Sequence, residues 1–312
     1  MTETVLAVDC GQTGIKLRLQ SPGEPVRESR HPGVRTDRPL LPQLAAAVQD
    51  SGLSAPTLTF GVSGLTSAED DAAELLAVLG DAGIERVLLT HDSVTSYLGA
   101  LGDRPGAVVA AGTGVVTLAV GPHRTARVDG WGYIMGDEGS GYWIGQQALR
   151  AVMRAYDGRG PATGLSEPVR ERWPRLDEAY IALQSAPDRV SRVASLAREV
   201  ARWAPTDTVA RDICVRAATE LAHSAATALR LVTEEQPSQQ SLPVAAIGGV
   251  FSNELIAEEF ALVLGELQPR AEVVPADGDG LAGALRLAQL GAEHPLMHLV
   301  SEARRGEHGV GS

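Results

Sequence analysis

Short apolar runs alternate with stretches of helical periodicity along most of this chain. In the first hundred residues the runs predict five strands, at Val5–Val8, Ile15–Leu19, Val26–Ser29, Leu58–Val62 and Val87–Leu89. The spacing between them predicts three helices, over Leu40–Val48, over Ala68–Leu79 after a Ser67 cap, and after Asp92. This order is typical of an α/β domain with a mostly parallel core sheet.

The strand-turn-strand opening recurs about one hundred residues later, which indicates an internal duplication. Ala107–Ala111, Gly112-Thr113-Gly114 and Val115–Val120 repeat the arrangement around Asp9–Gly14. We therefore expect two domains, residues 1–103 and 104–312, the second with an all-helical insertion over about 158–240. The remaining pattern predicts helices at Ser140–Tyr156, Leu176–Thr233, from Asn253 and from Leu281, strands at Val244–Ile247 and Glu272–Pro275, and a frayed tail over Arg304–Ser312.

Composition and charge disfavour several classes of function. The 312 residues include 27 basic and 39 acidic side chains, a net charge of −12, which disfavours binding to nucleic acids. The basic residues are arginines with one exception, Lys16. Cys10 and Cys214 lie too far apart for a CxxC ligand pair, which indicates a reducing, cytoplasmic setting. No stretch reaches the roughly 18 apolar residues of a membrane span, and the N-terminus is predicted as a strand rather than a leader.

Three glycine-rich turns at predicted strand ends are candidate nucleotide contacts. In Asp9–Gly14, backbone amides and the Thr13 hydroxyl can contact a phosphate, and Asp9 can hold a hydrated Mg²⁺. Taken alone, this turn is better interpreted as an ordinary hairpin with a solvated aspartate. Gly112-Thr113-Gly114 and Gly248-Gly249 add a second phosphate contact and room for an adenosine. Because a Walker lysine loop and a Rossmann glycine pattern are absent, the nucleotide is expected between two domains.

Two further features carry candidate chemistry. Asp92 follows a predicted strand, where its carboxylate can act as a catalytic base for phosphoryl transfer or simply cap the next helix. Gly130–Gly145 combines six glycines with aromatic residues; in it, Asp137 and Trp131 suit the hydroxyls and ring face of a sugar. The alternative is that Trp131 and Trp143 fill the core and that Asp137 starts a helix, and core packing is the better interpretation for Trp143.

At these residues the chain resembles the BadF/BadG/BcrA/BcrD ATPase family, and within it the N-acetylglucosamine kinases. The resemblance extends over Val8–Gly14, Gly61–Gly64, Asp92, Gly112–Gly114, Gly130–Gly145, Gly248–Val250 and Gly283-Ala284. It implies two ribonuclease-H-like, actin-like ATPase domains around a central cleft, with the last helix (about 281–290) packed on the first domain. It also implies use of ATP and Mg²⁺, transfer of the γ-phosphoryl group to the 6-hydroxyl of an amino sugar, and a homodimer.

The resemblance assigns roles to individual residues. Asp92 matches the general base, and Asp137, Trp131, Ser63, Gly64 and Gly141 match the sugar site. Asp9 is the expected metal contact, and the expected nucleotide contacts are Gly11, Gln12, Thr13, Gly112, Thr113, Gly114, Gly248, Gly249 and Asn253. Lys16, on the strand after the first turn, either supports the nucleotide phosphates or is an exposed strand residue.

The first turn departs from the family's usual Asp-Gly-Gly-Gly-Thr-Lys, and Gly33-Val34 stands where these kinases carry an Asn that contacts the sugar. N-acetylglucosamine, glucosamine and other amino sugars therefore stay open as acceptors. A regulator that binds nucleotide or sugar without turnover is one alternative function. The other is an ATP-driven activator of a 2-hydroxyacyl-CoA dehydratase, which the cysteine count disfavours because a bridging iron–sulfur cluster needs thiolates.

Overall fold

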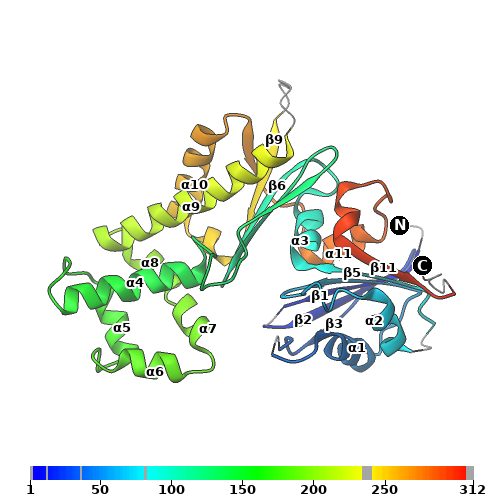
Figure 1. Ribbon diagram of the computed structural model, residues 1–312, viewed down its shortest axis with the longest axis horizontal. Helices are drawn as coiled ribbons and strands as arrows, with labels where there is room; N and C mark the ends of the chain where they lie inside the picture. Colours follow the sequence, from blue (N-terminus) through cyan, green and yellow to red (C-terminus); the bar gives the residue numbers. More distant parts are fainter. Residues whose placement is uncertain (1–2, 12, 36, 81–82, 234–240, 307–312) are drawn as a thin grey trace. The chain divides into compact units, whose positions relative to one another are not determined.

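The structure is a computed structural model that describes residues 3–11, 13–35, 37–80, 83–233 and 241–306. The chain forms two compact units (Figure 1). Unit 1 comprises Met1–Pro105, Val120–Thr125 and Pro275–Ser312, and unit 2 comprises Gly106–Ala119 and Ala126–Val274. The C-terminal segment thus belongs to the same unit as the N-terminal strands.

Unit 1 is built on a six-stranded sheet with the order β11-β5-β4-β1-β2-β3. Its strands are β1 (Val5–Cys10), β2 (Ile15–Gln20), β3 (Arg27–His31), β4 (Thr57–Val62), β5 (Arg86–His91) and β11 (Val300–Arg304). The central strands β1, β4 and β5 are parallel, whereas β2, β3 and β11 pair antiparallel with their neighbours. The carboxyl ends of the three parallel strands therefore share one edge of the sheet.

Alternation along β1 sends side chains to two different cores. Leu6, Val8 and Cys10 pack with α1 (Leu40–Ser51) and α2 (Ala72–Leu79), whereas Val5 and Ala7 pack against α11 (Gly280–Leu287). Figure 1 shows α1 and α2 on one face of this sheet, and α11 with α3 (Asp92–Leu101) on the other. Asp9 follows Ala7 in this alternation, so it belongs to the face covered by α3 and α11.

Unit 2 carries a five-stranded sheet with the order β10-β9-β6-β7-β8. Its strands are β6 (Gly106–Ala111), β7 (Val115–Val120), β8 (Thr125–Val128), β9 (Leu242–Ile247) and β10 (Ala271–Val274). Its helices are α4 (Gly141–Tyr156), α5 (Ser166–Arg172), α6 (Ala179–Ser185), α7 (Arg189–Ala194), α8 (Ala197–Trp203), α9 (Thr208–Val232) and α10 (Glu254–Leu267). Two short 3₁₀ turns complete the fold, Gly249–Ser252 in unit 2 and Pro295–Leu299 in unit 1.

The two sheets repeat one strand order, because β5-β4-β1-β2-β3 and β10-β9-β6-β7-β8 are equivalent position by position. In this repeat α11 follows β10 as α3 follows β5. The predicted α/β class is confirmed. The shared strand order supports the duplication that the glycine-rich turns indicated.

Three local predictions were wrong. The second helix begins at Ala72 and not at Ala68, because Asp71 caps it by accepting hydrogen bonds from the amides of Ala73 and Glu74. The Glu69 side chain accepts from the Leu40 amide instead, at the beginning of α1. The predicted tail begins with Arg304 paired in β11, a strand that the sequence pattern did not predict. Helix α11 ends at Leu287, before Leu290.

Candidate active site

In unit 1, the carboxyl ends of three adjacent strands bring several predicted site residues together. Val62 of β4 is in register with Cys10 of β1 and with His91 of β5. Asp9, the turn after β1, Ser63 and Asp92 therefore stand at the same edge, and the Ser63 amide donates to the Cys10 carbonyl at 2.8 Å. Gly64 follows with a φ of +76°, a conformation that favours glycine.

The register of β1 and β2 places Lys16 directly opposite Asp9. Ile15 and Leu17 point into the core under α1 and α2, so Lys16 lies on the other face, where its Nζ is 3.8 Å from Asp9 Oδ2. Burial raises the pKa of Asp9; Lys16 opposes this shift, and the nearby Asp92 and Asp279 add to it. The one lysine of the chain is thus the counter-ion of the aspartate predicted to hold the metal.

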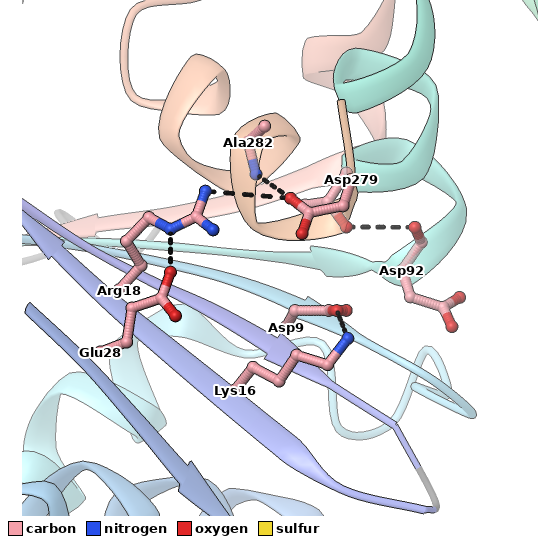
Figure 2. A network of polar contacts seen from close by, with 8 residues as sticks. Asp9, Lys16, Arg18, Glu28, Asp92, Asp279 and Ala282 are labelled. Carbon is pink, nitrogen blue, oxygen red and sulfur yellow. Dashed lines mark hydrogen bonds and ion pairs between the residues drawn. The ribbon is translucent and has the colours of Figure 1, made fainter. Parts of the chain in front are cut away.

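The beginning of α11 adds a third carboxylate, which the sequence prediction missed. Asp279 caps α11 by accepting from the Ala282 amide at 2.9 Å, and its Oδ1 lies 3.9 Å from an Arg18 nitrogen. Gly280 packs over Asp9 so closely that a Cβ there would lie 3.0 Å from the Asp9 carboxyl carbon. Figure 2 shows Asp9, Lys16, Arg18, Asp92 and Asp279 gathered where β1, β2, α3 and α11 meet. The signal was available, because α11 is the repeat equivalent of α3.

Asp92 is the first residue of α3 and not its cap. His91 occupies the cap position, where its Nδ1 accepts from the Ser93 amide at 3.2 Å. The same Nδ1 lies 2.9 Å from Asp92 Oδ1. Because His91 performs the capping, the Asp92 carboxylate, 31% exposed, is available at the helix N-terminus, where the helix dipole favours a negative charge.

The donor set at this edge suits a hydrated Mg²⁺. The described residues contain no group of three or more His, Cys, Asp or Glu side chains placed to ligate one ion directly. A magnesium ion typically keeps several waters and takes one or two carboxylates from the protein. Asp9, half-buried with acidic neighbours and a single cation beside it, provides such a carboxylate.

The turn after β1 is only partly described. The Gly11 amide donates to the Gly14 carbonyl at 3.0 Å, which closes the turn, and Thr13 is exposed. Gln12, a predicted nucleotide contact, lies outside the described residues. The Gly11 carbonyl accepts from the amide of Val34, whose side chain is buried. The residue that stands in place of the family's sugar-binding Asn is therefore part of the core.

In unit 2, the equivalent turn after β6 is held by the N-terminus of α4. The amides of Gly141 and Tyr142 donate to the carbonyls of Gly112 and Thr113, at 2.8 Å and 3.0 Å. A Cβ on Gly141 would lie 2.8 Å from the Gly112 oxygen, so this glycine permits the close approach. Gly112 and Thr113 remain exposed, and Gly114 lies against Asp137, whose Oδ2 would be 2.6 Å from an added Cβ.

Asp137 is more enclosed than a solvent-facing sugar contact would be. Its side chain is 8% exposed, and its Oδ1 accepts from the Gly132 amide at 3.2 Å. Burial raises the pKa of Asp137, and the nearby Asp129 adds to this shift. Asp129, which the sequence prediction missed, orders the loop by accepting from the amides of Gly130, Asp137 and Glu138.

The aromatic residues of this loop differ in exposure. Trp131 is 59% exposed, with the Arg127 guanidinium 5.3 Å from its ring centroid. Trp143 is partly buried and packs against the unit 2 core, in line with its interpretation as a core residue. The neighbouring Ile134 and Met135 are both largely exposed.

The third glycine-rich turn, Gly248-Gly249 after β9, contains one glycine that packing requires and one with open space beside it. Gly248 has a φ of +98°, and a Cβ there would lie 2.3 Å from the Ala111 oxygen, so β6 itself requires glycine at this position. At Gly249 a Cβ would meet nothing within 4 Å, which leaves open space for a ligand. Asn253, a predicted nucleotide contact, caps α10, and its side-chain amide donates to the Cys214 sulfur at 3.2 Å.

Comparisons with known proteins agree with this architecture. The chain is 28% identical over 247 residues to an N-acetylmuramic acid/N-acetylglucosamine kinase of Clostridium acetobutylicum, covering 74% of this chain and 76% of that protein. A crystal structure of a putative N-acetylglucosamine kinase from Chromobacterium violaceum matches with a TM-score of 0.69 and 29% identity, covering 92% of this chain and 99% of the other.

A Streptomyces griseus ROK family glucokinase, solved with glucose and AMPPNP, shares the fold at a TM-score of 0.55 and 18% identity, covering 93% of this chain and 99% of the other. Among the described residues, no helix is long and apolar enough to cross a membrane. The sequence profile of one family matches residues 33–288, most of the chain. The chain belongs to the BadF/BadG/BcrA/BcrD ATPase family.

Proposed function

We propose that this protein is an ATP-dependent sugar kinase that phosphorylates the 6-hydroxyl of an amino sugar of the N-acetylglucosamine type. One observation carries the proposal: in a chain similar to N-acetylglucosamine kinases, the partly exposed Asp92 carboxylate stands at the same strand edge as Asp9 and its Lys16 counter-ion. This edge provides a base, a metal-binding carboxylate and a phosphate-binding turn within one unit.

In the proposed reaction Asp92 accepts the proton of the sugar hydroxyl. The hydroxyl oxygen forms a bond to the γ-phosphorus of ATP, and the bond from that phosphorus to the β,γ-bridging oxygen breaks, so that ADP leaves. A Mg²⁺ held through water by Asp9 would neutralise phosphate charge.

The glycine turns supply the proposed nucleotide contacts. Thr13, Gly112 and Thr113 are exposed at turns that end strands β1 and β6, and Lys16 adds a positive charge near the first turn. The chain has a net charge of −12, so attraction of ATP depends on these local groups and on the metal. Gly249, with open space around it, supports the proposed place of the adenosine.

Recognition of the sugar is proposed for the loop that contains Trp131 and Asp137. The exposed Trp131 ring offers a flat surface for the apolar face of a sugar. Asp137 already accepts from the Gly132 amide, so it contributes its remaining lone pairs and the shape of the loop. The side chain of Val34 is buried. The residues that select the acceptor sugar must therefore differ from those in kinases that carry an Asn at this position.

The activator alternative is less well supported. Cys10 and Cys214 are both fully buried, in different units, and burial raises the pKa of Cys10 to about 12. A cluster that bridges two subunits needs ionised thiolates at a surface. Two buried free thiols also fit the reducing, cytoplasmic setting that we propose for this kinase.

The test is turnover of ATP with a panel of hexosamines by the wild type and Asp92→Asn. We expect the variant to keep its nucleotide affinity and to lose about 10²–10⁴-fold in kcat, the usual contribution of a general base. Asp71→Asn is a matched control, because asparagine preserves the cap of α2 away from the site. Unchanged turnover in Asp92→Asn would remove Asp92 from the mechanism, and no turnover of any hexosamine would refute the kinase itself.

A further inference from the structure

Helices α4 and α9 of unit 2 line an open surface cavity that the proposed reaction does not use. Its volume is about 550 Å³, within the roughly 300–1,000 Å³ typical of small-molecule sites. Arg150, Arg154 and Gln147 line it from α4, and Thr208, Asp212 and Arg216 line it from α9. Figure 1 shows these two helices side by side. Apart from Pro161, the lining residues therefore belong to helices rather than to loops.

The walls of this cavity are predominantly positive. Arg150 and Arg154 lie one turn apart on α4, an arrangement of like charges that slightly destabilises a helix. The only acidic side chain among the lining residues, Asp212, is 3.6 Å from Arg216 and so partly neutralised already. Within the described part of the chain, the Arg150 side chain makes no hydrogen bond or ion pair. The cavity thus holds uncompensated positive charge.

One of the three guanidinium groups is held in place from three directions. Arg216 donates to Gln147 Oε1 at 3.2 Å, approaches Asp212, and lies 5.2 Å from the Trp143 ring centroid. Arg154 donates through one nitrogen to the Arg159 carbonyl at 3.1 Å, which leaves its other donors available. An orientation fixed before binding reduces the entropy lost when a ligand is bound.

The charge of this region contrasts with that of the whole chain. Residues 141–233 contain 13 arginines and 10 acidic residues, a net charge of +3, whereas the remainder of the chain carries −15. The N-terminus of α9 adds little to the field, because Asp207 already caps it by accepting from the Ala210 amide. The arginine side chains therefore set the preference of the cavity for anions.

The chemistry of the lining indicates what kind of anion fits. Guanidinium groups pair with phosphate oxygens through two parallel hydrogen bonds. Gln147 and Thr208 offer neutral partners for hydroxyl groups, and Val209 and Ile213 provide an apolar wall. A phosphate group on a small polyhydroxylated body matches all three kinds of surface.

We propose that this cavity is a second binding site, which takes the phosphate ester of a monosaccharide. Arg150 and Arg154 contact the phosphate, and Gln147 and Thr208 contact the hydroxyls. The choice of a sugar phosphate rests on the proposed function, since that reaction would produce one. The site would then allow the product to influence the enzyme away from the catalytic residues.

The test measures binding by titration calorimetry without nucleotide, so that its result does not depend on turnover. The probes are inorganic phosphate and N-acetylglucosamine 6-phosphate, the latter with saturating N-acetylglucosamine to block the proposed sugar site. The variant is Arg150→Gln/Arg154→Gln, and the control is Arg198→Gln/Arg202→Gln. The control pair has the same spacing and charge change on α8, and it does not line this cavity.

We expect both probes to bind the wild type, with the sugar phosphate the tighter of the two. Loss of two charge-assisted contacts should weaken both probes by at least about tenfold in the cavity variant and leave the control pair unchanged. Absence of binding, or equal weakening by the control pair, would overturn the site. Equal affinity for the two probes would overturn the assignment of a sugar-bearing ligand. A failed kinase assay together with cavity-dependent phosphate binding would refute the proposed function and leave the site standing.

Discussion

Glycine at position 283 allows α11 to pack directly on α3, and replacing it tests how the unit 1 site is positioned. A Cβ at Gly283 would lie 1.7 Å from the Thr95 carbonyl oxygen and 2.6 Å from the Gly99 nitrogen. Real Cβ atoms essentially never lie within 3.0 Å of such atoms, so Gly283→Ala must move the two helices apart by more than 1 Å. Asp92 begins one of these helices and Asp279 caps the other.

The cost can be worked from the packing. An inserted methyl group in a well-packed core costs about 1–3 kcal/mol, and the upper end applies here because the obstacle is helix backbone and cannot rotate away. Alanine regains about 1 kcal/mol through its higher helix propensity. We therefore expect Gly283→Ala to lower the free energy of unfolding by about 2 kcal/mol. Activity should fall as well, since the Asp92 and Asp279 carboxylates are displaced relative to each other.

The assay is urea unfolding followed by far-ultraviolet circular dichroism. Tryptophan fluorescence is unsuitable, because all four tryptophans lie in unit 2, whereas α3 and α11 lie in unit 1. Gly265→Ala in α10 is the matched control, since a Cβ there would meet nothing within 4 Å. The control should gain about 0.5–1 kcal/mol from helix propensity. If Gly283→Ala were as stable as the wild type, the packing argument would be refuted.

Two further predictions concern charge. Lys16→Met removes the cation that opposes the raised pKa of Asp9. As the pH rises through that pKa, the free energy of unfolding of the variant should fall about 1 kcal/mol below that of the wild type. Urea unfolding at pH 7 and pH 4 measures this loss, with Arg30→Met on the neighbouring strand as the control. An equal loss at both pH values would contradict the prediction. Burial disfavours ionised Asp207, but hydrogen bonds from backbone amides and from the Thr163 hydroxyl lower its pKa overall. The stability that ionised Asp207 contributes to the fold is therefore fully present above the ordinary carboxyl pKa. It is lost as the pH falls through the lowered pKa of Asp207 in the folded protein. Asp207→Ala should lower the free energy of unfolding by about 2 kcal/mol at neutral pH and by less in acid. Thermal unfolding across this pH range measures the loss, and a loss that does not change with pH would contradict the reasoning.

Local pattern predicted most of the strands and the helices of unit 1, because side-chain alternation and turn residues act over only a few positions. The prediction failed at the second helix, where Thr66, Glu69 and Asp71 all offer oxygens near a helix start. Glu69 caps α1 at Leu40, 29 residues away, and only the fold brings that helix end within reach. The same reason explains why β11 was missed: Val300–Arg304 becomes a strand by pairing with β5, more than two hundred residues earlier.

The candidate site shows the same division between short-range and long-range information. Asp9, Asp92 and the glycine turns could be named from the sequence, because each stands beside an apolar strand. Asp279 and Gly280 could be named only through the repeat that makes α11 the equivalent of α3, because their place against Asp9 depends on α11 returning to the first sheet. No periodic signal connects residues that far apart.

The sequence by itself determined the alternation of strands and helices, the repeated turns and the excess of acidic residues, since these depend on the order of residue types alone. Tertiary structure decided which groups meet. It set Lys16 against Asp9, placed Gly280 over Asp9, and brought Arg150 of α4 and Arg216 of α9 to the wall of one cavity. Such contacts require that separate elements be packed together, because a charge or a hydrogen bond is defined by distance in space and not along the chain.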